Sequence, residues 1–306
     1  MSSEELFAIR NQFYSSQYSE VISNHDIDNV TTNEIKQYIL RSYLALGQYS
    51  KVIELANNEP ELAGLVYYSK YLSGDQSIAD EFVSYAKSNK PSLLTQILAA
   101  IVLVKQYQRY DDAIELLTSG INMENHDELN LEVFSVIVQI YLLQDALSKA
   151  KNFLKKFSHL NINDSVVYNY SDALVSLVQG GSTATQHAFY FFEEISHSLR
   201  SLKNLTFMMV VHLLLNHVPE SSEIMEQIDE LIANDDSLKA DEHYLTYLIN
   251  KAKVLIINNQ GSEALQLINN EILSTADQSH PYVVDYNEKI ALFDGVVDKY
   301  AAQISN

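Results

Sequence analysis

The side chains best suited to chemistry are a set of carboxylates within one predicted helix. They recur at helical spacing and comprise Glu223, Glu226, Asp229 and Glu230. Paired carboxylates can act as general acid and general base, but that role needs a cleft from which water is excluded. Because apolar residues such as Ile224 and Ile228 interleave with the acids at helical spacing, the pattern favours the solvent-exposed face of an amphipathic helix.

Candidate metal ligands do not converge in the sequence. His212 and His217 are five residues apart, a rotation of about 500° along a helix, so we expect them on different faces. A calcium-loop pattern is suggested by the alternating residues Asn24, Asp26 and Asp28. However, Asn29 replaces the glycine of such a loop, and Ile35 replaces its bidentate carboxylate. We predict no metal site, no cofactor site and no catalytic residue.

The sequence also lacks the common catalytic motifs. It contains no Gly-rich phosphate loop, no Gly-x-Ser-x-Gly elbow and no His-Glu-x-x-His helix. Because cysteine is absent, neither disulfides nor thiolate metal sites can form. The formal net charge of −20 disfavours nucleic acid and anionic lipid, since phosphate groups carry the same sign. We therefore expect no nucleic-acid partner, only indirect membrane contact and a preference for basic partners.

Composition favours a helical protein. Eight glycines and four prolines in 306 residues are far below the average usage of roughly 7% and 5%. The segment 1–10 is acidic and polar, unlike a secretory signal. No apolar run approaches the roughly 20 residues that span a bilayer.

The stretch 41–55 shows how the helices are organised. Apolar residues recur at helical spacing before and after Gly47, which can adopt the left-handed conformation that ends a helix. Tyr49 can then pack into the corner between two helices, and Val52 occupies the position where their backbones approach. Since neither helix can bury its apolar face alone, such a hairpin needs neighbours.

The same hairpin recurs along the chain with a mean period of about 35 residues. Aligning each close-approach position gives Val21, Val52, Ala79, Ala113, Ala150, Ala188, Ile224 and Ala264. The predicted helix pairs are 6–13 with 18–22, 34–46 with 48–56, 60–72 with 78–86, 91–104 with 110–117, 129–143 with 147–157, 166–178 with 185–199, 202–215 with 220–232, and 242–257 with 263–273. We predict an all-α, right-handed α-solenoid of about eight hairpins, with a C-terminal capping helix at about 281–302. No linker divides it, so we expect a single domain over 1–306.

Two sets of residues are candidates for partner binding. Aromatic side chains on first helices, which line the concave face of a solenoid, suit protein recognition; these are Tyr67, Tyr71, Tyr141 and Tyr170. The predicted groove positions further include Arg41, Gln139, Ile249 and Lys253. Core packing between helices is the alternative role for the tyrosines.

The hairpins resemble tetratricopeptide repeats, with Gly47 at the turn, Tyr49 at the corner and Ala113 at the close approach. Val52 and Ile224 depart from the small residue of that family, so the repeats are degenerate. More specifically, the chain resembles the epsilon-subunit family of coatomer, the COPI vesicle coat. That resemblance is carried by the segments 6–22, 175–181 with its double glycine, 188–195 and 280–301.

The resemblance implies a non-enzymatic coat protein that is cytoplasmic and peripheral on Golgi membranes and COPI vesicles. It implies binding and stabilisation of the C-terminal domain of the coatomer alpha subunit, contact with other coatomer subunits through it, and retrograde transport from the Golgi to the endoplasmic reticulum. An alternative function is an adaptor that clamps a peptide C-terminus, for which the groove must supply convergent basic residues. Only Arg41 and Lys253 are basic at those positions. An all-helical enzyme is a third, least supported possibility.

Overall fold

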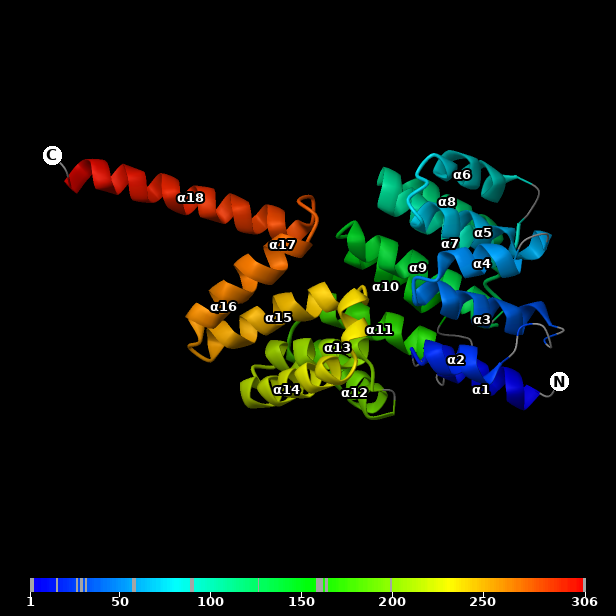
Figure 1. The fold of residues 1–306 in the computed structure, drawn as a ribbon, viewed down its shortest axis with the longest axis horizontal. Helices are drawn as coiled ribbons and strands as arrows, with labels where there is room; N and C mark the ends of the chain where they lie inside the picture. Colours follow the sequence, from blue (N-terminus) through cyan, green and yellow to red (C-terminus); the bar gives the residue numbers. More distant parts are fainter. Residues whose placement is uncertain are drawn as a thin grey trace. The chain divides into compact units, whose positions relative to one another are not determined.

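The computed structural model describes residues 3–14, 16–25, 27, 30, 32–56, 59–88, 91–125, 127–157, 162, 165–198 and 200–304. Within these ranges the regular secondary structure is entirely helical (Figure 1). Antiparallel helices follow one another through short turns, as the hairpin pattern of the sequence predicts. The predicted all-α fold is therefore confirmed for the described residues.

Sixteen of the described helices form the expected pairs. They are α1 (Ser3–Tyr14) with α2 (Tyr18–Asn24), α3 (Asn33–Ala45) with α4 (Tyr49–Ala56), α5 (Ala63–Leu72) with α6 (Ile78–Lys87), α7 (Leu93–Tyr107) with α8 (Tyr110–Gly120), α9 (Glu128–Leu143) with α10 (Leu147–Phe157), α11 (Val166–Gln179) with α12 (Ser182–Ser198), α13 (Leu202–Leu214) with α14 (Val218–Asn234), and α15 (Tyr244–Ile257) with α16 (Gly261–Leu267). Short 3₁₀ helices, η2 (Pro60–Leu62) and η3 (Asp236–Ala240), precede α5 and α15. Most predicted helix ends agree with the structure to within three residues.

The close-approach positions explain the packing of each pair. All eight aligned residues, from Val21 to Ala264, are at most 9% exposed. A small or β-branched side chain there lets the second helix lie against the first, and the larger apolar residues around it fill the remaining space. The corner tyrosines Tyr18, Tyr49 and Tyr110 are each the first residue of a second helix. The repeat alignment is confirmed.

The turns use the left-handed conformation, although glycine does not always supply it. Gly47 has φ 71°, and the N–H of Gln48 donates to the carbonyl of Tyr43 at 2.9 Å, which closes the end of α3. In the turn before α16 the left-handed residue is Asn259, with φ 63°, whereas Gly261 begins the helix. Asparagine tolerates this region better than most residues, so Asn259 can take the role that Gly47 has in its own turn.

The chain divides into two compact units, Met1–Leu199 (unit 1) and Arg200–Asn306 (unit 2). In unit 1 a continuous core of buried apolar residues extends from Leu40 to Val175. In unit 2 the core lies among α13, α14 and α15, where Met209, Ile228 and Tyr247 are buried. The expectation of a single domain over 1–306 stays a prediction.

The last helices differ from the simple hairpin pattern. The helix expected at 263–273 is α16, followed by a π-helical segment, η4 (Ile268–Ile272), and a final turn, α17 (Leu273–Thr275). The terminal helix α18 (Pro281–Ile304) is present where it was predicted. It buries Val283 and half-buries Tyr282 and Tyr286, but every residue from 287 to 300 is exposed. The helix therefore caps unit 2 with its first turns only.

Candidate functional site

The polar face of α9 is the most organised group of side chains in unit 1. Asp127 caps the helix, because its carboxylate accepts a hydrogen bond from the backbone N–H of Asn130 at 2.9 Å. Most of the helix is apolar and buried. A narrow polar stripe nevertheless recurs at intervals of three and four residues, which places its members on one face. This α9 stripe consists of Glu128, Glu132, Ser135 and Gln139.

The centre of the stripe is a buried ion pair. Arg41, on α3, donates from both terminal nitrogens to the two carboxylate oxygens of Glu132, at 2.9 and 2.8 Å. Their side chains are only 17% and 9% exposed. Burial opposes the charge on Arg41, but the adjacent Glu132 carboxylate outweighs it, so the pKa of Arg41 is raised above its ordinary value. The guanidinium also lies 4.6 Å from the ring centroid of Phe13.

A tyrosine from the first helix completes the arrangement. The hydroxyl of Tyr14 donates to Glu132 Oε1 at 2.5 Å. Burial, followed by the negative charge of Glu132, raises the pKa of Tyr14 far above its ordinary value. The same two causes raise the pKa of Tyr38, on α3, to about 12. One carboxylate on α9 thus connects α1 and α3, which lie far from it in the sequence.

Outside its centre the stripe is half-buried at Glu128, buried at Ser135 and exposed at Gln139. Arg10, on α1, pairs with Glu128 at 3.2 Å. The Ser171 hydroxyl, on α11, donates to the Ser135 hydroxyl at 2.9 Å, while Gln139 donates to Ser135 at 3.1 Å. Gln139 itself is exposed. The buried part of the stripe therefore joins helices, and its exposed end leaves neutral polar groups accessible.

Sequence reasoning placed Arg41 at a groove position but missed its pairing with Glu132, and it missed Arg10 and Tyr14 altogether. One signal was available. A carboxylate within an otherwise apolar, buried helix requires a partner, because an unpaired buried charge is costly. Since Arg41 is already engaged by Glu132, the structure gives it a role in holding the fold. Its predicted contact with a partner protein stays a prediction.

The four candidate tyrosines of unit 1 are half-buried, and each contacts a neighbouring helix. Tyr67 stacks on Phe82 of α6 at 5.4 Å, and its hydroxyl donates to Glu81 at 2.9 Å. The other three have these contacts: Tyr71 with Gln106 at 3.3 Å, Tyr141 with Phe153 at 6.1 Å, and Tyr170 with Phe192 at 5.9 Å. The four tyrosines thus pack between helices, and part of each residue remains accessible. Their contact with a partner protein stays a prediction.

In unit 2 the two candidates on α15 lie one turn apart. Ile249 is half-buried and Lys253 is exposed. Because positions four residues apart share a helical face, they present one apolar and one cationic side chain together. Binding of a partner by these two residues stays a prediction.

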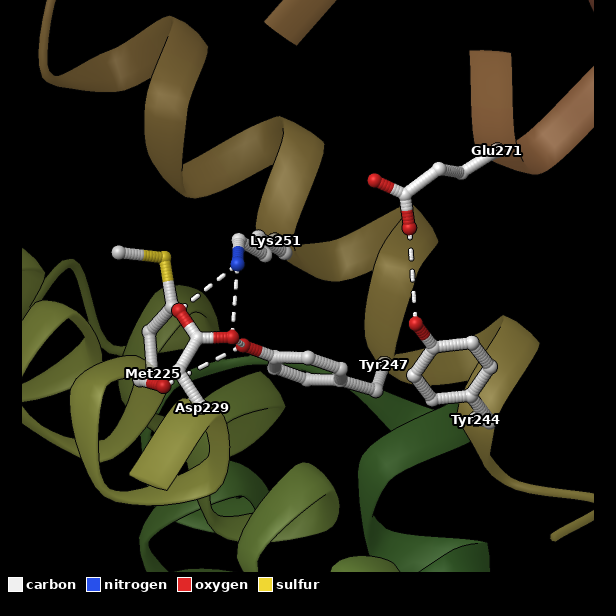
Figure 2. A network of polar contacts seen from close by, with 6 residues as sticks. All are labelled: Met225, Asp229, Tyr244, Tyr247, Lys251 and Glu271. Atoms are coloured by element: carbon white, nitrogen blue, oxygen red, sulfur yellow. Dashed lines mark hydrogen bonds and ion pairs between the residues drawn. The ribbon is translucent and has the colours of Figure 1, made fainter. Parts of the chain in front are cut away.

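The expected acidic face of α14 is confirmed at three of its four residues. Glu223, Glu226 and Glu230 are exposed, but Asp229 is half-buried. As Figure 2 shows, Lys251 donates to both carboxylate oxygens of Asp229 at 2.7 Å, and the Tyr247 hydroxyl donates to Oδ1 at 2.5 Å. Asp229 therefore links α14 to α15, although its side chain remains 42% exposed.

The expectation that His212 and His217 diverge is wrong. Their ring centroids are 5.6 Å apart. Helix α13 ends at Leu214, and Asn216 adopts φ 61°. The backbone N–H of His217 then donates a hydrogen bond to the carbonyl of His212 at 2.9 Å. A rotation calculated for an unbroken helix does not apply across this turn.

Metal binding and membrane crossing can both be checked against the described part of the chain. Within it, no group of three or more histidines, cysteines or acids is arranged to hold a metal ion. Asp26, Asp28 and Asn29, from the calcium-loop pattern, lie outside the described residues. No described helix combines the length and apolarity needed to cross a bilayer. The assembled polar groups form structural links between helices.

Comparison with solved structures supports the fold. A tetratricopeptide repeat protein from Parabacteroides merdae superposes with a TM-score of 0.55 over 88% of this chain and 96% of that protein, at 11% identity. The Cut9–Hcn1 hetero-tetramer of APC/C gives a TM-score of 0.54 over 88% of this chain and 55% of the matched chain, at 13% identity. At such low identity these similarities establish the tetratricopeptide-like fold alone.

Sequence comparison is more specific. The coatomer epsilon subunit family model matches residues 2–301. The coatomer epsilon subunit of Saccharomyces cerevisiae is 23% identical, covering 97% of this chain and 98% of that protein. A probable coatomer epsilon subunit of Schizosaccharomyces pombe is 25% identical, covering 95% of this chain and 94% of that protein. The epsilon subunit of Caenorhabditis elegans is 24% identical, covering 96% of this chain and 97% of that protein. From these matches across its length, the chain belongs to the coatomer epsilon subunit family and is a component of the COPI coat.

Proposed function

We propose that the chain is a non-enzymatic scaffold that binds and stabilises the C-terminal domain of the coatomer alpha subunit. Through that contact it joins the other coatomer subunits and supports retrograde transport from the Golgi to the endoplasmic reticulum. The observation that carries this proposal is the family match over residues 2–301. The chain then acts in the cytoplasm and is peripheral on Golgi membranes and COPI vesicles.

The chemistry of the described surfaces supports a binding role. In the α9 stripe the buried charges are paired inside the fold, so they hold helices together rather than converge on a substrate. The remaining accessible candidates are aromatic, apolar or neutral polar side chains together with the exposed cation Lys253, and such a mixture suits protein recognition. The net charge of −20 favours basic partner surfaces and repels anionic lipid. Attachment to the membrane is therefore indirect.

The test is co-purification of the full chain with a recombinant C-terminal domain of the alpha subunit. We expect a single one-to-one complex in gel filtration at micromolar concentrations. Two separate peaks would contradict the proposal. An assay for turnover on a broad substrate panel completes the test, with no activity expected.

A charge reversal at Lys253 sharpens the test at residue level. If Lys253 contacts the partner, Lys253→Glu weakens binding by about tenfold, which corresponds to 1.4 kcal/mol. Lys239→Glu is a matched control, because Lys239 is also exposed on unit 2 and undergoes the same charge change. Equal affinities of the two variants would remove Lys253 from the interface without affecting the proposed partner.

The alternative adaptor function finds no support in the geometry. A clamp for a terminal carboxylate needs free basic side chains that converge. Arg41 already donates both terminal nitrogens to Glu132. Tight binding of an acidic C-terminal peptide that is lost in a folded Arg41→Ala variant would restore this alternative.

A further inference from the structure

The terminal helix α18 carries the largest run of exposed apolar side chains in the described chain. From 287 to 300 all residues are exposed, in contrast to every earlier α-helix of comparable length. Six of the exposed side chains are large and apolar, each between 44% and 70% exposed: Ile290, Leu292, Phe293, Val296, Val297 and Tyr300. Their combined exposed area is on the order of 500 Å², the size of the largest and often functional apolar patch on a monomeric protein. Such a patch indicates a binding surface.

The spacing of these residues is that of a helix-packing seam. Beginning in the buried first turns, apolar residues recur at alternating intervals of three and four: Val283, Tyr286, Ile290, Phe293, Val297 and Tyr300. One subset of these positions is β-branched and the other is aromatic. A heptad pattern of this kind places one stripe against another helix. We name the exposed part, Ile290, Phe293, Val297 and Tyr300, the α18 seam.

The internal hairpins show what normally covers such a stripe. The first helices α7 and α15 are each followed by an antiparallel second helix, which contributes a buried alanine at the close approach, Ala113 or Ala264. Helix α18 occupies the place of a next first helix. Within the described residues, no second helix follows it.

The charges beside the seam favour one class of occupant. Lys289 is already paired with Asp285 at 2.6 Å. Asp294 and Asp298 lie along one edge of the seam and have no ion-pair partner among the described residues. A second copy of the chain would bring another net charge of −20, and anionic lipid would also repel this edge. A helix with basic residues along the facing edge is complementary.

We propose that the α18 seam is the docking surface for one amphipathic helix of another coatomer subunit. That helix carries small side chains opposite Phe293 and Tyr300 and basic side chains opposite Asp294 and Asp298. It supplies to α18 the cover that second helices give to first helices inside this chain. The inference rests on the role of the chain as a coat protein, and it assigns the part of the chain that makes the contact.

The test uses the full chain co-expressed with the other coatomer subunits, and it scores incorporation into the purified complex. The seam variant is Phe293→Asp with Val297→Asp. The matched control is Ala291→Asp with Gly295→Asp, because these exposed positions have the same four-residue spacing, lie off the seam and add the same charge. Circular dichroism with a helical spectrum and gel filtration at the monomer volume verify that both variants fold. We expect incorporation of the seam variant to fall at least about tenfold, which corresponds to 1.4 kcal/mol, while the control resembles the wild type.

Equal incorporation of the seam and control variants would overturn the proposal, as would a wild-type chain that is not incorporated. Two further measurements address the other occupants. Self-association of the wild type in sedimentation, lost in the seam variant, would assign the surface to a second copy instead. Flotation with phosphatidylserine vesicles, lost in the same variant, would assign it to a membrane. If the chain enters coatomer but does not bind the isolated domain of the alpha subunit, the proposed function fails while the seam remains tested separately.

Discussion

Unit 1 and unit 2 each hold a carboxylate between a basic side chain and a tyrosine hydroxyl. In unit 1, Glu132 accepts from Arg41 and Tyr14. In unit 2, Asp229 accepts from Lys251 and Tyr247 (Figure 2). The chemistry is alike, but the surroundings differ. The charged side chains of the first pair are 17% and 9% exposed, whereas those of the second are 23% and 42% exposed.

The two arrangements also connect different parts of the chain. Glu132 holds helices whose residues lie 91 and 118 positions away, whereas Asp229 holds partners 18 and 22 positions away on the next long helix. Removing one member of a buried pair leaves an uncompensated charge, while water readily replaces an exposed partner. Burial, rather than the number of bonds, therefore decides how strongly each arrangement supports the fold.

The largest effect is expected for Arg41→Ala in unit 1. This change leaves Glu132 buried without its cation, so the free energy of unfolding should fall by about 3–5 kcal/mol. Urea unfolding followed by circular dichroism measures it. Lys253→Ala is the control, because it removes an exposed cation, and it should change stability by less than about 0.5 kcal/mol.

A double variant separates charge from packing in the same experiment. Arg41→Met with Glu132→Gln removes both charges but retains an acceptor for Tyr14. It should recover most of the stability lost in Arg41→Ala, since breaking a buried pair costs more than replacing both members. If the single variant were as stable as the wild type, the central role of this pair would be wrong.

A smaller effect is expected for Tyr14→Phe, which removes only the hydroxyl that donates to Glu132. A hydrogen bond to a charged group contributes about 1.5–3 kcal/mol, and the ring contacts with Phe13 and Tyr38 remain possible. Unfolding in urea should show a loss in that range. No measurable loss would indicate that Arg41 alone satisfies Glu132.

We predict that the free energy of unfolding falls at alkaline pH because of one tyrosine in each unit. Burial first, and then a neighbouring carboxylate, raises the pKa of Tyr14 and of Tyr247 far above the ordinary value near 10. The folded state keeps these protons while the unfolded state loses them, so stability is full below about pH 10 and falls above it. Each such tyrosine should contribute a slope of about 1.4 kcal/mol per pH unit. Unfolding curves between about pH 9 and pH 11 test this, and Tyr14→Phe should have the shallower slope.

The smallest effect is expected for Lys251→Ala in unit 2. Because Asp229 is substantially exposed, water can solvate it when the lysine is removed. We expect a loss of about 1 kcal/mol or less by urea unfolding. A loss as large as that of Arg41→Ala would show that exposure does not distinguish the two arrangements.

Local features of this chain were predictable from sequence. Helical spacing, the turn at Gly47 and the close-approach residues from Val21 to Ala264 act between neighbours in the sequence, so the helix pairs followed from them. One failure has a local cause too. The rotation between His212 and His217 assumed an unbroken helix, which the left-handed residue Asn216 interrupts.

The candidate site was less predictable, because its contacts are long-range. Nothing near Arg41 in the sequence identifies Glu132 as its partner, although a carboxylate on an apolar helix indicates that a partner exists. Asp229 was expected to be free in solvent because its helical face is acidic, yet Tyr247 and Lys251 of α15 bond to it. The exposure of the α18 seam is also a long-range property, because it arises where no other helix packs against α18. Helical periodicity alone does not predict that absence.

We propose that buried charged groups join the helices of the described fold, and that apolar surfaces, above all the α18 seam, bind partner proteins. Hydrogen exchange of the full chain, alone and in purified coatomer, tests this directly. We predict that the amides of α18 become protected in the complex, whereas those of α9 around Glu132 are already protected in the free chain. Unchanged exchange in α18, with new protection confined to α9 and α3, would contradict the account.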